Sequence, residues 1–456
     1  MRIRTTAKVA SLAALAALAL AACGAGSSSS SGDSGSPAAV DGKGKTLSVL
    51  VNTNALYPDQ QKQWFSDMAT KFKAKTGADL KYETFTSANE ELQRIQTSVV
   101  SGQGPDVYSL GTTFTPTAVA TGAFVQLGDD EWKKIGGKDR FNKATLGISG
   151  PSDKKLFGVP FVSRPFVMAY NKDILAAAGI DKPATTWDGL LEQAKKTTDA
   201  SKGQYGLSVA YKDNFDPWKF VWAMSVQAGN KIVDGDKAKL DDPAMKKAYE
   251  TYFGWVTKDK VVNPAAVGWS NSQALAEFAA GKAAFFPMTT SNSIPTLDKS
   301  PLKDKYEYAI MPVAAPGDSS PKDGGTPAAS ILSGDNMVVA DYSKNKDLAY
   351  AYMEMVTSKD EQLNYQKMFG DLPANAEGLK SLSSAPHMAA ITEAAEKSFA
   401  TPFTGAWGDI QLALLNVTVQ SVPDLAAGNV PEATLNQRLK DAQDKAQSSL
   451  DRAGKQ

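Results

Sequence analysis

The sequence predicts an α/β fold with more than one domain, and three observations support this. Segments rich in apolar and β-branched residues alternate with amphipathic segments over residues 46–110, which is the spacing of βαβ units. The alternation resumes with new material after residue 157. The chain has 456 residues, more than one ordinary hydrophobic core accommodates, so two or three domains are expected.

The first βαβ region predicts a parallel sheet covered by helices on both faces. After the first strand, Trp64, Met68 and Phe72 recur at helical spacing, and Gly77 is a suitable helix C-cap. We expect strands at 46–51, 80–85 and 105–110, and helices at 60–75 and 90–101.

The rest of the chain is predicted to be mostly helical after a strand-rich stretch at 157–170. Thr185 or Thr186 can cap the helix beginning at Trp187, and Leu435 and Leu439 give the last helix an apolar face. The expected helices span 173–178, 187–198, 215–228, 243–258, 272–280, 347–355, 361–369, 407–422 and 432–450.

The N-terminal segment has the pattern of a secretory signal, predicted over residues 1–22. Arg2, Arg4 and Lys8 precede an apolar stretch, residues 9–20, that is too short for an ordinary transmembrane helix. The single cysteine, Cys23, follows small residues that resemble a bacterial lipobox. That resemblance implies a thiol alkylated by diacylglycerol at the first residue of the mature chain. The alternative is a plain secretory signal with an incidental cysteine.

Residues 23–45 are rich in serine and glycine and predict a flexible tether between the lipid anchor and the folded body. Formal charge is balanced, and no basic stripe of the kind that binds nucleic acid is present. The sequence therefore predicts a monomer held at the outer face of the cell membrane. The tether and the lipobox favour a Gram-positive surface over a Gram-negative periplasm.

The sequence offers little for catalysis or metal binding. Its one histidine is His387, and Cys23 is assigned to the lipid, so a nucleophile–histidine arrangement has few options. A His/Cys metal site is excluded by count, and neither a Gly-x-Ser-x-Gly elbow nor a P-loop is present. We therefore expect a protein without catalytic residues, metal or cofactor.

Several short strings occur in a characteristic order along the chain. They include Gly104-Pro105-Asp106-Val107, Val159-Pro160-Phe161, Tyr170-Asn171-Lys172-Asp173, Phe278-Ala279-Ala280-Gly281-Lys282 and Tyr342-Ser343-Lys344. Each string is weakly specific alone. In this order, behind a lipobox-like cysteine, they resemble the extracellular solute-binding proteins of bacterial ABC importers, in the carbohydrate family that includes maltose-binding protein. The similarity covers residues 46–450.

The resemblance implies a periplasmic-binding-protein-like fold, with two α/β lobes, a hinge and a ligand cleft between them. It implies lobe 1 at 46–158 plus 289–335, and lobe 2 at 159–288 plus 336–456. It also implies a lipid-anchored receptor that captures a carbohydrate, expected to be an oligosaccharide, and delivers it to the membrane subunits of an ABC permease.

A sugar site needs polar groups for the hydroxyl rims and aromatic rings for the C–H faces. By resemblance, Trp218, Trp222 and Trp407 are candidates for stacking, and Trp269 is a further one; the spacing of Trp218 and Trp222 also fits a core stripe. Arg164, at the crossing between lobes, could grip hydroxyls or form a salt bridge across the hinge. The polar candidates are Asn52, Asn54, Glu83, Thr112, Thr113, Asp216, Thr290, Ser291, Ser333 and Gly334.

Two other functions remain open at this point. A secreted glycosidase needs only two suitably spaced carboxylates in a cleft, and the chain has 49 acidic residues. A receptor for a non-sugar solute, such as glycerol phosphate, a polyamine or a peptide, would share the fold. The mostly neutral and aromatic candidates favour carbohydrate.

Overall fold

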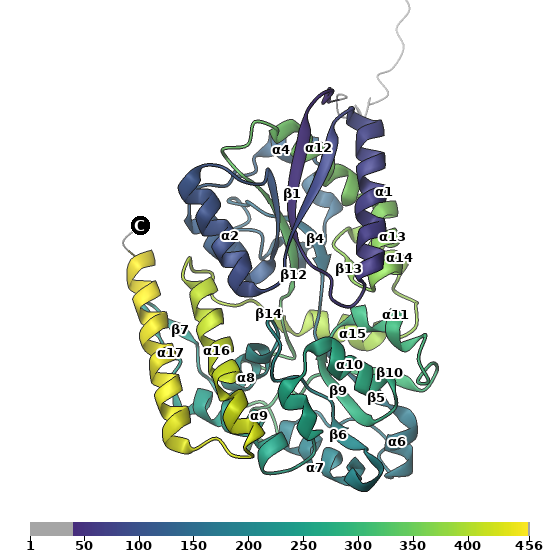
Figure 1. The fold of residues 1–456 in the computed structure, drawn as a ribbon, viewed down its shortest axis with the longest axis vertical. Helices are drawn as coiled ribbons and strands as arrows, with labels where there is room; N and C mark the ends of the chain where they lie inside the picture. Colours follow the sequence, from purple (N-terminus) through teal and green to yellow (C-terminus); the bar gives the residue numbers. More distant parts are fainter. Residues whose placement is uncertain (1–39, 455–456) are drawn as a thin grey trace, which may run out of the picture. The chain divides into compact units, whose positions relative to one another are not determined.

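The computed structural model describes residues 40–454 (Figure 1). The predicted signal segment, Cys23 and the tether as far as residue 39 lie outside the described residues. Residues 40–45, predicted as the end of the tether, instead lie against the first helix, where Gly42 N donates to Thr76 O at 2.7 Å. Among the described residues, no helix is long and apolar enough to cross a membrane.

The first sheet has six strands in the order β13-β4-β12-β3-β1-β2. The three strands predicted at the start of the chain, β1, β2 and β3, are parallel as expected, whereas β12 runs antiparallel to both β3 and β4. Their bounds are β1 (Thr46–Asn52), β2 (Asp79–Phe85), β3 (Val107–Gly111), β4 (Val159–Ser163), β12 (Gly334–Val339) and β13 (Leu372–Pro373).

The second sheet has four strands in the order β10-β5-β9-β6, and two short ribbons pair β7 with β8 and β11 with β14. The strand-rich stretch at 157–170 is therefore two strands in different sheets. The bounds are β5 (Val167–Asn171), β6 (Tyr205–Leu207), β7 (Val233–Asp234), β8 (Lys237–Ala238), β9 (Ala283–Thr289), β10 (Tyr306–Ile310), β11 (Ser330–Ile331) and β14 (Ser398–Phe399).

Helices cover both sheets, and capping follows the sequence signals: Thr186 accepts from Gly189 N, and Gly77 adopts a left-handed conformation. The helices are α1 (Pro58–Thr76), α2 (Ala88–Ser101), α3 (Thr115–Ala120), α4 (Asp129–Lys134), α5 (Lys143–Leu146), α6 (Lys172–Ala177), α7 (Trp187–Thr197), α8 (Pro217–Gln227), α9 (Pro243–Thr257), α10 (Asn271–Ala279), α11 (Ile294–Leu297), α12 (Lys346–Val356), α13 (Lys359–Phe369), α14 (Ala376–Ser381), α15 (Met388–Glu396), α16 (Trp407–Ala426) and α17 (Glu432–Ala453).

We call the part built on the six-stranded sheet the first lobe and the part built on the four-stranded sheet the second lobe. The strand pairing divides the chain differently from the predicted boundaries. β4, β13 and the whole of β12 pair in the first sheet, although 159–163, 372–373 and 336–339 were expected in lobe 2. β10, expected in lobe 1, pairs with β5 in the second sheet. Hydrogen-bonded pairing between distant segments, rather than chain order, decides which sheet each strand joins.

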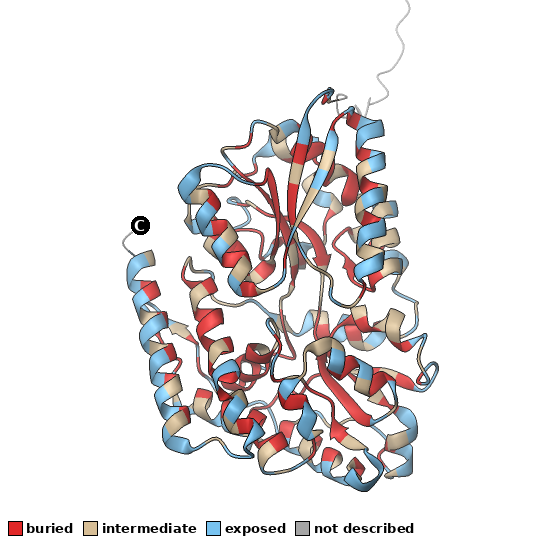
Figure 2. Ribbon diagram, in the orientation of Figure 1, coloured by how far each residue is buried: buried red, intermediate tan, exposed pale blue. Residues whose placement is uncertain are grey.

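One hydrophobic cluster belongs to the first lobe, and another joins first-lobe residues such as Tyr108 and Phe114 to α8 and α16 of the second lobe. Trp64, Met68 and Phe72 of α1 pack onto the first sheet with residues of α12, as their spacing predicts. In the second lobe, α8 is enclosed by α9 and α16, and ten of its eleven residues are buried. Figure 2 shows the strands mostly buried, whereas α1 and α17 present exposed outer faces.

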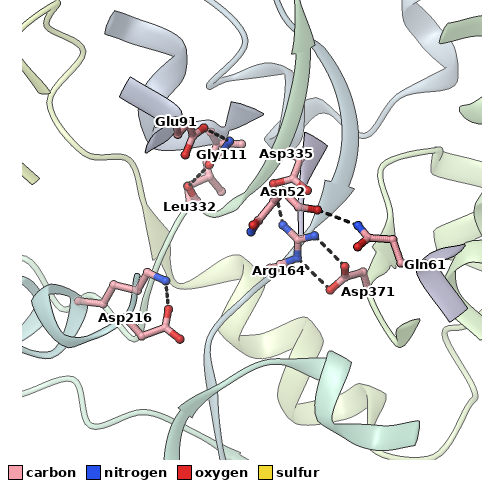
Figure 3. A network of polar contacts seen from close by, with 11 residues as sticks. Asn52, Gln61, Glu91, Gly111, Arg164, Asp216, Leu332, Asp335 and Asp371 are labelled. Atoms are coloured by element: carbon pink, nitrogen blue, oxygen red, sulfur yellow. Dashed lines mark hydrogen bonds and ion pairs between the residues drawn. The ribbon is translucent and has the colours of Figure 1, made fainter. Parts of the chain in front are cut away.

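Arg164 connects the segments that cross between the lobes. It lies between β4 and β5, and its backbone N–H donates to Ser333 O, between β11 and β12, at 2.9 Å. Its guanidinium forms a two-pronged contact with Asp371 (Nε–Oδ1 2.9 Å, Nη2–Oδ2 2.8 Å) and donates to Asp335 Oδ1 at 2.7 Å (Figure 3). This cluster ties the chain before β5 to the start of β12 and to the residue before β13.

The Asp371 carboxylate is the deeply buried member of this cluster, with 3% of its surface exposed. Burial raises the pKa of Asp371, Arg164 acts against that rise, and the nearby Asp335 adds to it. The hinge salt bridge, one of the two interpretations offered for Arg164, is thus what the structure contains.

Gly334 is expected to be essential to the crossing between β11 and β12. Its φ is +156°, and a Cβ at this position would lie 2.0 Å from Val162 O in the neighbouring β4. We expect Gly334→Ala to lower the free energy of unfolding by roughly 2 kcal/mol or more, measured by guanidinium chloride denaturation. Gly268→Ala is the control, because that Cβ meets nothing within 4 Å. Equal denaturation midpoints for the two variants would contradict the assignment.

Replacing the Arg164 guanidinium should destabilise the fold, because the two carboxylates that it neutralises lose their cation. We expect Arg164→Met to lower the free energy of unfolding by about 2–4 kcal/mol at neutral pH, because Asp371 is left buried without a cation. Without that cation its folded-state pKa rises further above the unfolded value, so the loss should shrink as the pH falls and the carboxyl takes up a proton.

The double variant Arg164→Met/Asp371→Asn should recover part of the lost stability, since the buried charge is then absent. Denaturant unfolding of both variants at neutral and at acidic pH tests this. A loss that is independent of pH in the single variant would show that the ion cluster is not its cause.

Candidate functional site

A cleft of about 400 Å³ lies between the lobes, and both lobes and the crossing segments line it. Its first-lobe wall begins where the parallel strand β1 ends, the place where open α/β sheets commonly bind ligands. The volume is within the usual range for small-molecule sites. The cleft is therefore the candidate functional site.

The first-lobe wall consists of amides held by the start of α1. Gln61 Nε2 donates to Asn52 O at 2.7 Å (Figure 3), and Asn54 N donates to Gln61 Oε1 at 2.9 Å. The Asn54 side-chain oxygen accepts from the N–H groups of Leu56 and Tyr57, which shapes the entry to α1. The Asn52 side chain is exposed where the strand ends.

Aromatic rings from α1, β2 and α13 line the same wall. Phe65 stacks on Tyr82 with centroids 4.0 Å apart, and Trp64 meets Tyr365 edge-on at 5.0 Å. Phe65, Tyr82 and Tyr365 keep part of their surface exposed. We did not predict these rings as site residues. The sequence does hint at them. Trp64 and Phe65 are adjacent on the helix that follows the first strand, and adjacent residues of a helix cannot both point into the core.

The second-lobe wall is made by two loops, one before α8 and one before α10. Asp216 accepts from the ammonium of Lys219 and from the side-chain amide of Asn271. The Lys219 ammonium also lies 4.5 Å from the centre of the Phe166 ring, on the crossing segment. Asp216 and Lys219 are therefore paired with each other, whereas the exposed Lys212, which also lines the cleft, has no ion pair among the described residues.

Asp213 lies beneath this wall with 9% of its surface exposed. Its Oδ1 accepts from the N–H groups of Phe215 (2.8 Å) and Asp216 (3.0 Å), and its Oδ2 accepts from Asn271 N at 2.9 Å. Burial raises the pKa of Asp213, and the negative charge of Asp216 raises it further. The carboxylate joins both loops of the wall.

Six of the predicted site residues line the cleft. They are Asn52, Asn54, Arg164, Asp216, Thr290 and Ser333. Three of the five donors of Arg164 are used by the two aspartates, so the guanidinium can still donate to a ligand. Direct contact of these residues with a ligand stays a prediction.

The predicted stacking residues are elsewhere. Trp218, Trp222 and Trp407 are 0–2% exposed and do not line the cleft. Trp218 and Trp407 pack edge to face with ring centroids 6.0 Å apart. The reason is that α16 packs against α8, which turns the i, i+4 pair of α8 into core. Trp269 is partly buried against the core and is also absent from the lining.

The remaining candidates have structural roles. Glu83 forms ion pairs with Lys81 and Arg94, and Thr112 Oγ1 lies 3.4 Å from Leu332 O. Gly334 permits the close approach of β12 to β4. None of these three, nor Thr113 or Ser291, is among the described residues that line the cleft.

The carboxylates Asp213, Asp335 and Asp371 were missed as site residues. Asp335 and Asp371 are far from Arg164 in sequence, so no local pattern announces the cluster. Asp213 has a local signal, because an aspartate three residues before Asp216 and four before Pro217 can accept the backbone N–H groups of a turn that starts a helix.

Comparisons with known proteins agree with this geometry. The family described as bacterial extracellular solute-binding protein matches residues 67–390. The diacetylchitobiose binding protein DasA of Streptomyces coelicolor is 28% identical over 390 residues, which cover 82% of this chain and 84% of DasA.

Two solved structures share the two-lobe fold at low sequence identity. An ABC transporter solute-binding protein of Thermotoga lettingae, bound with α-D-tagatose, has a TM-score of 0.73 and 22% identity over 89% of this chain and all of that one. The GacH receptor of Streptomyces glaucescens has a TM-score of 0.70 and 19% identity, over 89% of this chain and 98% of GacH. The predicted family and fold are confirmed: the chain belongs to the bacterial extracellular solute-binding proteins.

Proposed function

We propose that this protein captures a carbohydrate in the cleft outside the cell and delivers it to the membrane subunits of an ABC permease. The observation that carries the proposal is the lining of the cleft, where amides and paired carboxylates stand beside partly exposed aromatic rings. Such a lining suits a sugar, because the polar groups can bind its hydroxyls while the rings cover its C–H faces.

The balance of charge disfavours the charged solutes considered above. A polyamine needs unpaired carboxylates, yet Asp335 and Asp371 contact Arg164, and Asp216 contacts Lys219. A glycerol phosphate needs available cations; Arg164 and Lys219 are each paired with carboxylates, so Lys212 is left as the lining cation without an ion pair among the described residues. A neutral polyhydroxy compound needs neither and leaves every pair in place.

The engagement of the carboxylates also disfavours a glycosidase. That chemistry needs one carboxyl group that donates a proton to the leaving oxygen and another that acts as base or nucleophile. In this cleft Asp371 and Asp335 bind Arg164, and Asp213 binds three backbone N–H groups. Binding without conversion is the function that this arrangement supports best.

Delivery requires that the loaded protein differ from the empty one. A ligand lying between the lobes contacts both, so it favours the arrangement in which the two walls are closest. We propose that the permease recognises this ligand-bound arrangement of a monomer. We further propose that diacylglycerol on Cys23 holds the protein at the outer face of the membrane, with the Ser/Gly-rich segment as a tether.

A screen of solutes tests the proposed function directly. Diacetylchitobiose is the first probe, because the relative DasA is named for binding it; maltose, tagatose, spermidine and glycerol 3-phosphate complete the set. We expect a saccharide to raise the melting temperature and to be recovered unchanged. Stabilisation by spermidine or glycerol 3-phosphate alone, or the release of new reducing ends, would refute the proposal.

The second-lobe wall should contribute to affinity. We expect Asp216→Ala to weaken binding of the same saccharide by about tenfold or more, equivalent to about 1.4 kcal/mol, by isothermal titration calorimetry. Asp241→Ala is the control, because Asp241 is exposed in the same lobe and does not line the cleft. Equal affinities for the two variants would place the ligand elsewhere.

The anchor has its own test in cells. We expect Cys23→Ser to move the protein from the membrane fraction to the culture medium or periplasm, because the lipid-bearing thiol is absent. Fractionation and immunoblotting measure this, with saccharide affinity of the released protein as the check that folding is intact. A variant that stays with the membrane would contradict lipidation at Cys23.

A further inference from the structure

The Asp213 carboxylate joins two chain segments that are distant in sequence. Oδ1 accepts from Phe215 N and Asp216 N at the start of α8, and Oδ2 accepts from Asn271 N at the start of α10, 58 residues away. The segments meet a second time through the side chains of Asn271 and Asp216. These residues are among those with which the second lobe lines the cleft.

An ionised carboxylate suits this junction because both of its oxygens accept hydrogen bonds and neither donates one. Its placement is unfavourable in another respect. Asp213 is buried beside the negatively charged Asp216, and both conditions raise its pKa. A raised folded-state pKa means that ionisation of this group lowers the stability of the fold as the pH rises. Its hydrogen bonds nevertheless fix the spacing of the two loops that line the cleft.

We propose that Asp213 is a positioning residue for ligand binding, and that its carboxylate holds the loops 213–216 and 270–272 at the spacing in which Asp216 and Asn271 meet the ligand. The inference rests on the proposed function only in that the ligand contacts this wall. Asp213 acts through the two loops and needs no contact of its own with the sugar.

The junction gives affinity a dependence on pH. The titratable groups around Asp213 are Asp216 and its partner Lys219 on α8, Lys212 on the preceding loop, and Tyr252 on α9; α10 contributes Asn271, which does not titrate. As the pH falls through the raised pKa of Asp213, one oxygen takes a proton and no longer accepts from the backbone. Affinity should therefore decline on acidification.

The test compares Asp213→Asn with the intact protein. The asparagine keeps one accepting oxygen but places an NH₂ group against the other backbone N–H, so one of the loops is released. We expect hydrogen exchange of the unliganded protein to quicken at residues 213–216 or 270–272. Affinity for diacetylchitobiose should fall by about tenfold or more, and its dependence on pH between about 4 and 7 should flatten. The melting temperature should change by less than about 2 °C.

Asp242→Asn is the matched control. Asp242 is in the same lobe and accepts one backbone N–H, that of Ala244 at 2.8 Å, but it does not line the cleft. We expect this variant to keep the intact protein's affinity, its pH dependence and its exchange at both loops, since asparagine caps a helix as well as aspartate does.

The outcomes separate this inference from the proposed function. The inference about Asp213 is overturned if hydrogen exchange at both loops is the same in Asp213→Asn as in the intact protein. It is also overturned if exchange quickens but the affinity for diacetylchitobiose does not change. Faster exchange throughout the lobe with a large fall in melting temperature overturns it too, because the role is then merely structural. If no saccharide binds the intact protein, the proposed function fails, and exchange at the two loops alone decides whether Asp213 holds them.

Discussion

The contact of Arg164 with Asp371 and Asp335 is the interaction on which the arrangement of the lobes and the cleft depends. The guanidinium lies where the chain leaves the first sheet for the second, and its two partners lie where the chain begins β12 and approaches β13. A buried aspartate such as Asp371 is costly without a cation, and a planar fork is well suited to neutralise it. The cluster thereby joins the crossing segments and neutralises the buried Asp371 at the part of the cleft that these segments line, which we call its floor.

The two walls above this floor differ in chemistry and in origin. The first-lobe wall combines exposed amides at the end of β1 with rings from α1, β2 and α13, all resting on the first core. The second-lobe wall rests on loops that precede α8 and α10, with Asp213 beneath them. The two walls do not rest on independent cores, because one hydrophobic cluster joins first-lobe residues such as Phe114 to α8 and α16 of the second lobe.

The sequence was sufficient for features that depend on neighbouring residues. The order of β1, α1, β2, α2 and β3 and the caps at Gly77 and Thr186 follow from local patterns that the structure reproduces. The polar ends of strands were also predictable as cleft positions, since strand ends of open α/β sheets meet at the ligand crevice. Asn52 and Asn54, after β1, lie in the lining, whereas Thr112 and Thr113, chosen by the same rule after β3, do not.

Features decided by distant segments were not predictable in the same way. The exposure of Trp218 depends on where α16 packs, almost two hundred residues later in the chain. The partners of Arg164 come from strands and helices whose pairing no local pattern specifies. The predicted division of the lobes fails at β4, β10, β12 and β13 for the same reason, because hydrogen bonding across the sheets assigns these strands.

The burial of the indoles has an optical consequence. All eight tryptophans belong to the described residues, and Trp64 alone among them lines the cleft, edge-on to Tyr365 on the first-lobe wall. Six of the other seven are buried and do not line the cleft, whereas Trp269 keeps part of its surface exposed on the loop before α10, next to the lining residue Ser270. Two indoles, one on each lobe, are therefore placed where a bound molecule can change the natural fluorescence of this protein.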